Sequence, residues 1–127
     1  MRILLDTSVL IRGDAPPDDV DSSISTISIA ELHFGLLIAR NEESRAIRAA
    51  RLGAIEARYP DPLPVDDVVA REWGRLKAAV AQRGGKPRKR TADLGIAATA
   101  NVQGAELITH NLKDFKIIDD LVDLRTP

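Results

Sequence analysis

The sequence contains no cysteine, which excludes a disulfide framework, a thiolate zinc site and a cysteine nucleophile together. Histidine is scarce as well: His33 and His110 stand alone, without the spacing of a zinc hydrolase motif. Any metal site must therefore use oxygen or imidazole ligands, and without a zinc motif the oxygen-binding ions Mg²⁺ and Mn²⁺ are favoured. Aromatic residues make up only 3% of the chain, so we expect a core built from Ala, Leu, Ile and Val.

Long hydrophobic runs are also missing from the chain. No stretch approaches the roughly 20 apolar residues that span a bilayer, and residues 2–5 begin a core strand where a secretory signal would begin with a basic segment. We therefore expect a cytoplasmic protein that does not enter a membrane. The net charge of -1 gives no global basic field, although residues 83–90 hold five cations and no acid.

A chain of 127 residues with 44% hydrophobic and 29% charged residues fits one compact domain, residues 1–127. Its hydrophobic pattern predicts strands at 2–5, 23–27, 105–109 and within 116–124, and helices at 28–39, 42–58, 66–82 and 92–102. Strands that alternate with helices are typical of a parallel sheet covered on both faces. The expected fold is a three-layer α/β/α domain around a mostly parallel sheet of four to five strands.

Capping residues support the predicted helix starts. Ser28 and Glu31 have the spacing of a capping box. Asp66 or Asp67 can cap the helix that follows them, and Thr91 can cap the late helix.

Acidic and amide side chains gather at one expected edge of the sheet. Asp6 ends the first strand, Glu31 and Asp93 lie in the first turns of two helices, and Asn111 and Asp114 follow the strand at 105–109. Ligands of parallel α/β sheets bind outside the carboxyl ends of the strands. We therefore expect these side chains to meet at one edge.

Each of these acids also has a purely structural alternative. Glu31 can serve the capping box, and Asp93 can complement the helix dipole. Asp6 and Asp114 can bond to nearby backbone in turns. Their convergence favours a metal, because crowded carboxylates repel one another and raise their pKa values unless a divalent cation neutralises them. Two Mg²⁺ ions about 4 Å apart would support phosphodiester cleavage.

The acidic and amide residues of this edge fall in four segments of the sequence, and Phe34-Gly35 follows shortly after the second segment. The segments are residues 5–11 (LDTSVLI), 25–32 (STISIAEL), 91–100 (TADLGIAATA) and 107–115 (LITHNLKDF). In this order and at these intervals they resemble the PIN-domain nucleases, specifically the VapC-type toxins of bacterial toxin–antitoxin pairs. The resemblance covers essentially the whole chain.

The resemblance implies a PIN fold and a Mg²⁺- or Mn²⁺-dependent endoribonuclease that hydrolyses RNA phosphodiester bonds. Asp6 and Asp93 would be the main metal ligands, and Glu31 would complete the first site or orient its water. The fourth family position, often Asp, is Asn111 here, which adds no charge and puts a strongly bound second metal in question. Asp114, three residues on, is available to compensate as a fourth catalytic carboxylate.

The same resemblance implies two kinds of protein contact. The family's antitoxins cover the acidic pocket with a C-terminal segment that carries a basic side chain. Most such toxins act as homodimers. We therefore expect an antitoxin partner, a homodimer and an RNA substrate.

Basic residues offer candidate contacts for that RNA. Arg88, Lys89 and Arg90 directly precede the helix of Asp93 and are expected to hold the RNA backbone, with a solvated loop as the alternative. A second stripe, Arg45, Arg48 and Arg51, is either an exposed helix face or a surface for RNA or an acidic partner, with the alanines at 46, 49 and 50 turned inward. Trp73 and Phe34 are expected in the core or in subunit contacts.

Two alternatives to a nuclease remain at this point. A phosphoryl-receiver domain has a similar size, a parallel sheet and an acidic Mg²⁺ pocket, but it requires two adjacent acids after the first strand, where this chain has Asp6-Thr7. A PIN domain that binds RNA or protein without cutting is the second alternative, and Asn111 supports it.

Overall fold

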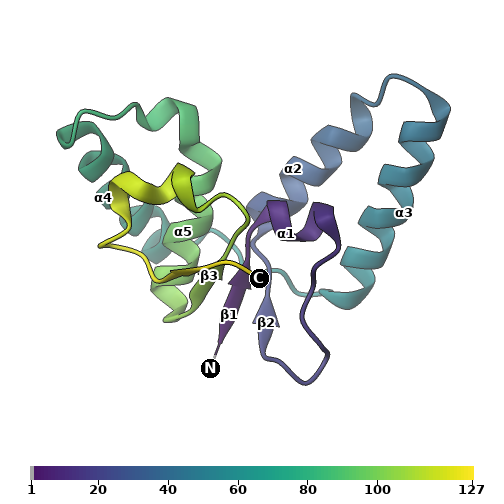
Figure 1. The fold of residues 1–127 in the computed structure, drawn as a ribbon, viewed down its shortest axis with the longest axis horizontal. Coiled ribbons are helices and arrows are strands. Elements are labelled where there is room, and N and C mark those ends of the chain that lie inside the picture. Colours follow the sequence, from purple (N-terminus) through teal and green to yellow (C-terminus); the bar gives the residue numbers. More distant parts are fainter. Residues whose placement is uncertain (1) are drawn as a thin grey trace.

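Four short parallel strands form the sheet of the computed structural model, which describes residues 2–127 (Figure 1). The strands are β1 (Ile3–Leu5), β2 (Ser22–Ser23), β3 (Glu106–Ile108) and β4 (Leu124–Arg125). Their order across the sheet is β2-β1-β3-β4, and Leu4 of β1 lies opposite Ser23 on one side and Leu107 on the other. The expected parallel sheet of four to five strands is confirmed.

Alternation along the strands divides the core into two clusters, one on each face of the sheet. Leu4 and Leu107 pack with α4 (Asp67–Gln82) and α5 (Thr91–Gln103). Ile3, Leu5 and Ile108 pack on the opposite face with α1 (Thr7–Arg12), α2 (Thr26–Leu37) and α3 (Glu42–Arg58). Successive strand residues point to opposite faces, so this division confirms the three-layer α/β/α arrangement.

The alanine-rich helix α5 is the most deeply buried helix of the first layer. Residues 94–100 are all buried. A side chain at Gly95 would come within 2.5 Å of Ile27 and 2.8 Å of Trp73, so only glycine allows this approach. The helix ends at Gly104, whose φ of 64° is the left-handed conformation that favours glycine.

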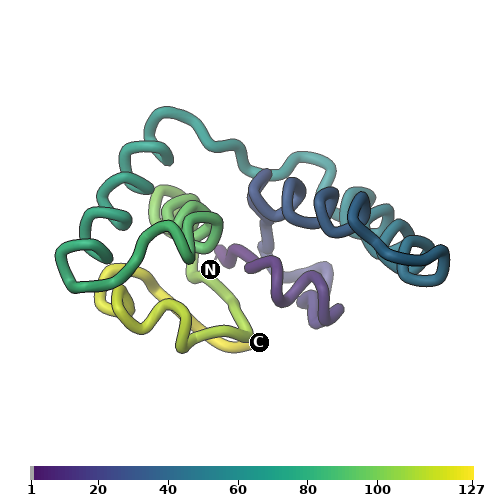
Figure 2. The backbone as a smooth tube through the Cα atoms, turned by 90° about the horizontal axis from the view of Figure 1, so that it is seen from above, coloured from purple at the N-terminus to yellow at the C-terminus, as the bar shows by residue number. Residues whose placement is uncertain are grey.

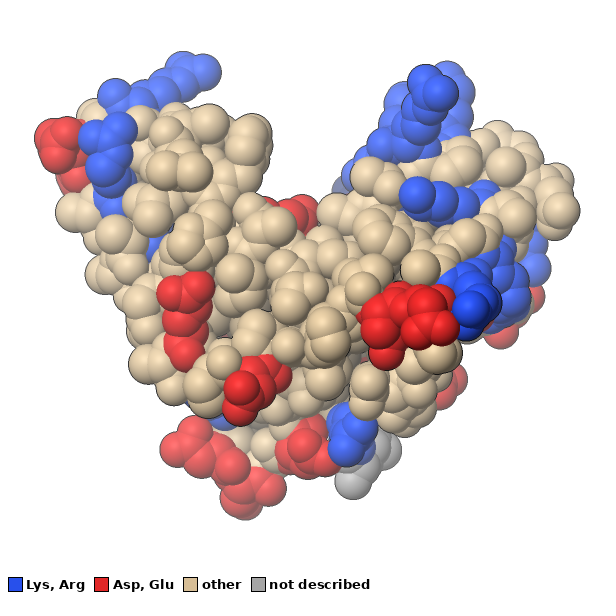
Figure 3. Space-filling view, turned by 180° about the vertical axis from the view of Figure 1, so that it is seen from behind, with Lys and Arg blue, Asp and Glu red and all other residues tan. Residues whose placement is uncertain are grey.

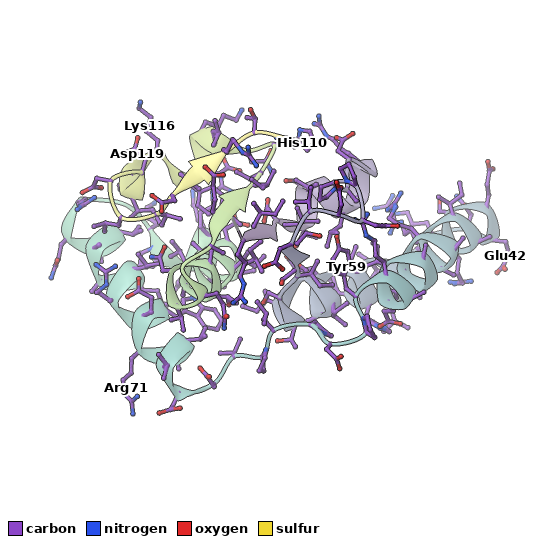
Figure 4. All side chains as sticks on the ribbon, turned by 90° about the horizontal axis from the view of Figure 1, so that it is seen from below. Glu42, Tyr59, Arg71, His110, Lys116 and Asp119 are labelled. Carbon is purple, nitrogen blue, oxygen red and sulfur yellow. The ribbon has the colours of Figure 1, made fainter. Side chains whose placement is uncertain are left out.

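Helices α2 and α3 form an arm that extends away from the rest of the molecule (Figure 2). Glu42 lies at the tip of this arm and Tyr59 near the sheet (Figure 4). Only Leu52 and Ile55 of α3 are buried, and the alanines at 46, 49 and 50 are exposed. The expectation that these alanines face the interior was wrong, because the outer half of the arm lies beyond the sheet and has no layer to pack against.

The region around residues 22–28 differs from its predicted structure. The predicted strand at 23–27 is reduced to Ser22–Ser23, and α2 begins at Thr26 with Ser25 as its cap, accepting a hydrogen bond of 3.0 Å from the Ile27 amide. Both Ser25 and Ser28 have capping chemistry. The backbone bridge between Ser25 and Leu63 holds Ser25 in extended conformation, so Ser28 and Glu31 lie inside the helix and form no capping box.

The other predicted elements vary in accuracy. Helices α3 and α4 match the predicted ranges, and Asp66 caps α4 by accepting from the Val69 amide at 2.9 Å. The end of the predicted basic loop is a 3-10 helix, η1 (Pro87–Arg90), which runs directly into α5, so Thr91 is inside that helix rather than its cap.

The C-terminal segment contains a helix that the sequence did not predict. A second 3-10 helix, η2 (Leu112–Ile118), buries Phe115 and Ile118 against the α4–α5 layer, and this burial delays the last strand to Leu124. Among the described residues, no helix has the length and apolar character needed to cross a membrane.

Candidate active site

Asp6 directly follows β1 at the carboxyl end of the strand, whose arrow points to the region between α5 and α1 (Figure 1). Its side chain is 3% exposed and does not cap α1. Oδ2 accepts hydrogen bonds from Ser8 and Thr109, each at 2.8 Å, whereas Oδ1 is buried with no hydrogen-bond partner among residues 2–127. The structure therefore does not support the turn-capping alternative, and it leaves one buried carboxylate oxygen unsatisfied.

Glu31 projects from the second turn of α2 and is held by hydroxyl groups. The Thr7 hydroxyl donates to Glu31 Oε1 at 2.6 Å and lies 2.8 Å from the Ser28 hydroxyl. Because Thr7 has one hydrogen and donates it to the carboxylate, Ser28 must donate to Thr7. The Ser28–Thr7 pair thus fixes Glu31 beside the end of β1.

Asp93, in the first turn of α5, lies in an unfavourable environment for a negative charge. Burial and, after it, the neighbouring carboxylates of Asp6, Glu31 and Asp114 raise its pKa to about 6, while Arg90 opposes them. Each of these three carboxylates therefore lies close enough to Asp93 to act on its charge. We call Asp6, Glu31, Asp93 and Asp114 the acidic rim.

Asp114 and Asn111 occupy different positions at this rim. Asp114 forms an ion pair with Arg90 at 3.0 Å, so it does not simply fold back on its own backbone. Asn111 is exposed, and its backbone amide donates to Thr109 Oγ1 at 3.0 Å. The amide side chain of Asn111 makes no hydrogen bond within the described chain and remains available to a ligand.

Hydroxyl groups that were not predicted to belong to the site support the acids. Ser8 donates to Asp6 and accepts from the His110 amide at 3.1 Å, and Thr109 donates to Asp6 while accepting from Asn111. The available signal was position, because Ser8 lies two residues after Asp6 and Thr109 directly follows β3. His110, labelled in Figure 4, is also fixed by a contact of its own: its ring Nε2 lies 2.6 Å from Asp14 Oδ2.

Within residues 2–127, no three carboxylate or imidazole side chains are arranged closely enough to hold a metal ion among them. The chemistry of the donors at the acidic rim nevertheless suits a divalent cation. Oδ1 of Asp6 is a buried, unpaired acceptor among the described residues, and the pKa of Asp93 is raised first by burial and then by the neighbouring carboxylates. A cation relieves both, and oxygen donors alone favour a hard ion such as Mg²⁺ or Mn²⁺.

Figure 3 shows a notch between the two sides of the molecule. Lys and Arg atoms lie on both sides of this notch, and acidic atoms lie at its floor. One side is formed by the α2–α3 arm and the other by α4 and η1 (Figure 1). Arg88 and Lys89 of η1 are exposed, whereas Arg90 is engaged with Asp114. Of the two aromatic residues considered above, Phe34 is 64% exposed, and Trp73 packs against the core and donates to the Thr91 carbonyl at 3.0 Å.

Several known proteins are similar to this chain. Residues 3–121 match the PIN domain family. The chain is 36% identical over 124 residues to Ribonuclease VapC5 of Mycobacterium tuberculosis, covering 91% of this chain and 87% of the relative. It is 35% identical over 104 residues to Ribonuclease VapC8 of the same species, covering 79% and 91%.

Solved structures show the same fold. The crystal structure of VapBC-5 from Mycobacterium tuberculosis, a member of the VapBC family of toxin–antitoxin systems, matches with a TM-score of 0.79 and 33% identity, covering 98% of this chain and 96% of that chain. FitAcB from Neisseria gonorrhoeae matches with a TM-score of 0.79 and 26% identity, covering 100% and 98%. The match of residues 3–121 to the family model and the identity to Ribonuclease VapC5 over nearly the whole chain establish that this protein belongs to the PIN-domain family.

Proposed function

We propose that this protein is a divalent-metal-dependent endoribonuclease and the toxin of a toxin–antitoxin pair. The observation that carries the proposal is the buried, unpaired Oδ1 of Asp6 beside the raised pKa of Asp93. A fold gains nothing from such an arrangement unless a cation completes it. The similarity to Ribonuclease VapC5 supports RNA as the substrate.

The residues that would hold the ion are Asp6, Asp93 and Glu31, with Asn111 as a neutral fourth position. Mg²⁺ is the expected ion and Mn²⁺ the alternative. When bound, the ion would supply a water activated for in-line attack and would offset negative charge on the phosphodiester.

The chain's own side chains position these groups and the RNA. Ser8 and Thr109 hold one oxygen of Asp6, and the other, unpaired within residues 2–127, would be available to the ion. Thr7, supported by Ser28, holds Oε1 of Glu31, so that Oε2 would be available to orient the attacking water. Arg88 and Lys89 hold the RNA backbone beside the rim. The products are a 5′-phosphate and a 3′-hydroxyl. Arg90, which is paired with Asp114, keeps that carboxylate in place rather than contacting RNA.

Family membership removes the phosphoryl-receiver alternative. A PIN domain that binds RNA or protein without cutting remains the competing function. It predicts that RNA stays intact with either cation and that the acidic rim serves only as a contact surface.

Incubation of the purified protein with single-stranded RNA, Mg²⁺ or Mn²⁺ separates these functions. We expect cleavage by the natural protein and a loss of at least about a hundredfold with Asp6→Asn or Asp93→Asn, because each change removes a ligand charge. Asp66→Asn is a matched control: it loses the same charge away from the rim and preserves the helix cap. Equal cleavage by all variants would identify a contaminating nuclease, and no cleavage by any would favour the non-cleaving function.

The proposed antitoxin fits an exposed apolar face of the α2–α3 arm. Phe34, Leu37, Ile38 and Ile47 are 64%, 76%, 55% and 54% exposed, a combination that usually marks a protein contact. We propose that a C-terminal segment of the antitoxin covers this face and places a basic side chain over the acidic rim. The toxin–antitoxin complexes among the similar structures support the partner.

We further propose that the toxin forms a homodimer. Light scattering of the purified protein tests this directly: a mass near twice that of the chain is expected, and a monomer at all concentrations would contradict it.

A further inference from the structure

A cavity of about 280 Å³ opens between α1, α2 and α3, next to the acidic rim. We call it the α2–α3 pocket. Its walls are formed by Ile11, Glu31, Leu32, Gly35, Arg48 and Arg51. Glu31 forms part of this wall, and its other contact, the Thr7 hydroxyl, comes from the residue next to Asp6, so the pocket adjoins the acidic rim at Glu31.

Two arginines give the pocket its charge, and they are held differently. Arg48 donates to the Gly35 carbonyl at 2.5 Å, which fixes its guanidinium against α2. Arg51 is partly buried and makes no ion pair or hydrogen bond with any residue in 2–127. Its five N–H donors therefore remain available, and a guanidinium binds phosphate through paired hydrogen bonds.

Gly35 keeps the pocket open. A glycine inside a helix is less favourable than alanine, yet a side chain here would meet no atom within 4 Å. Packing within the chain therefore gives no reason for the glycine. The backbone of α2 is accessible from the pocket at this position.

We propose that the α2–α3 pocket binds the nucleotide next to the cleaved phosphodiester, with Arg51 contacting its phosphate. This proposal rests on the ribonuclease function proposed above. An RNA strand with one phosphate at the acidic rim must place a neighbouring nucleotide beside Glu31, because the two sites share that wall. Ile11 and Leu32 supply an apolar surface for its ribose or base. RNA is favoured over a protein anion because the reaction centre and the pocket are contiguous.

The contact between Arg51 and the phosphate is tested by combining modified RNAs with an Arg51 variant, as in a double-mutant cycle. Two short RNAs each carry one neutral methylphosphonate, placed one linkage before the cleaved bond in the first RNA and one linkage after it in the second. In both, the 2′-hydroxyl next to the methylphosphonate is methylated. Control RNAs carry this 2′-O-methyl group and an ordinary phosphate. We expect kcat/KM of the natural protein to fall about tenfold with one of the two methylphosphonates, mainly through KM. Arg51→Gln should lose about tenfold on unmodified RNA and lose nothing further on that modified RNA.

Arg45→Gln is the matched protein control. It removes the same charge from the same helix, outside the pocket, where Arg45 pairs with Glu42 at 2.8 Å. It should leave kcat/KM nearly unchanged and should keep the full sensitivity to the methylphosphonate. If Arg51→Gln loses kcat/KM on each methylphosphonate RNA by the same factor as the natural protein does, Arg51 does not contact either phosphate. That result would overturn the pocket assignment and leave the ribonuclease function intact. No cleavage by the natural protein would overturn both.

A second variant tests the pocket without touching a charge. Gly35→Leu should fold, since a side chain there meets open space, and should raise KM by filling the cavity. Unchanged KM in this variant would also contradict the proposal. If Arg51→Glu weakens binding of an antitoxin and leaves RNA cleavage unaltered, the pocket belongs to the protein partner and the RNA assignment is wrong.

Discussion

At the scale of single residues, the ionised carboxylate of Asp93 lowers the free energy of unfolding of the metal-free protein, because its pKa is raised. Its folded value of about 6 lies above the ordinary value of 3.8, so the folded state holds this proton more tightly than the unfolded chain does. Ionisation of Asp93 therefore lowers stability as the pH rises from about 4 to about 6, and the loss remains at neutral pH. Below pH 4 both states are protonated and the effect vanishes.

Asp93→Asn should consequently stabilise the metal-free protein near neutral pH by about 1 kcal/mol, since solvent screens a carboxyl that is only partly buried. The gain should disappear below about pH 4. Urea unfolding in the presence of a chelator, repeated across this pH range, measures it. If the stability of the variant depends on pH in the same way as that of the natural protein, the ionised Asp93 does not destabilise the fold.

Thr109 illustrates how a hydroxyl can control a carboxylate. Thr109→Val removes a buried donor to Asp6, so we expect a stability loss of about 1 kcal/mol and Mn²⁺ binding weakened by about tenfold or more. Thr109→Ser keeps the hydroxyl and should restore binding. Calorimetric titration with Mn²⁺ measures both variants, and equal affinities for Val and Ser would show that the hydroxyl does not position Asp6.

At the scale of elements, the glycines of α4 and α5 offer opposite tests of helix packing. Gly95→Ala places a carbon 2.5 Å from Ile27 and 2.8 Å from the Trp73 ring, which should destabilise the fold by about 1–3 kcal/mol. Gly74→Ala on α4 meets no atom within 4 Å and should stabilise it by about 0.5–1 kcal/mol. Urea midpoints of the two variants should therefore move in opposite directions, and a shift of both in the same direction would contradict the tight contact between α5 and α4.

The predicted elements were accurate where a helix carries its own boundary signals. Helix α4 has Asp66 at its start, and α3 begins after Asn41, which accepts from the Ser44 amide. The start of α2 was predicted three residues late at its cap, because Ser25 and Ser28 are equally good local signals. The choice between them depends on the bridge to Leu63, a contact that local sequence does not reveal.

At the scale of the whole molecule, charge divides between the acidic floor of the notch and its basic sides. We expect RNA affinity to fall with salt, because each phosphate contact releases counterions. Arg88→Gln combined with Lys89→Gln should reduce the slope of log affinity against log salt by about 0.7 per side chain. Arg71→Gln, on α4 and paired with Asp67, should leave the slope unchanged. Equal slopes for both variants, measured by fluorescence anisotropy, would show that η1 does not contact RNA.

The same scale explains how much of the site the sequence could predict. The rule that ligands gather at strand ends correctly placed Asp6, Glu31, Asp93 and Asp114 at one edge, although Glu31 does not act as a cap. The rule could not predict that Arg90 pairs with Asp114 or that Thr109 donates to Asp6. These pairs bring together residues from separate elements, and only the assembled layers set their distances.

The hydrogen bond between Thr109 and Asp6 joins residues that are 103 positions apart, and β3 is the strand that lies directly beside β1. On the ribosome, a growing chain can pair β1 with β2 early, but Asp6 has no hydroxyl from Thr109 and β1 has no strand on its other side until the final segment emerges. The acidic rim is therefore among the last features to be completed during translation.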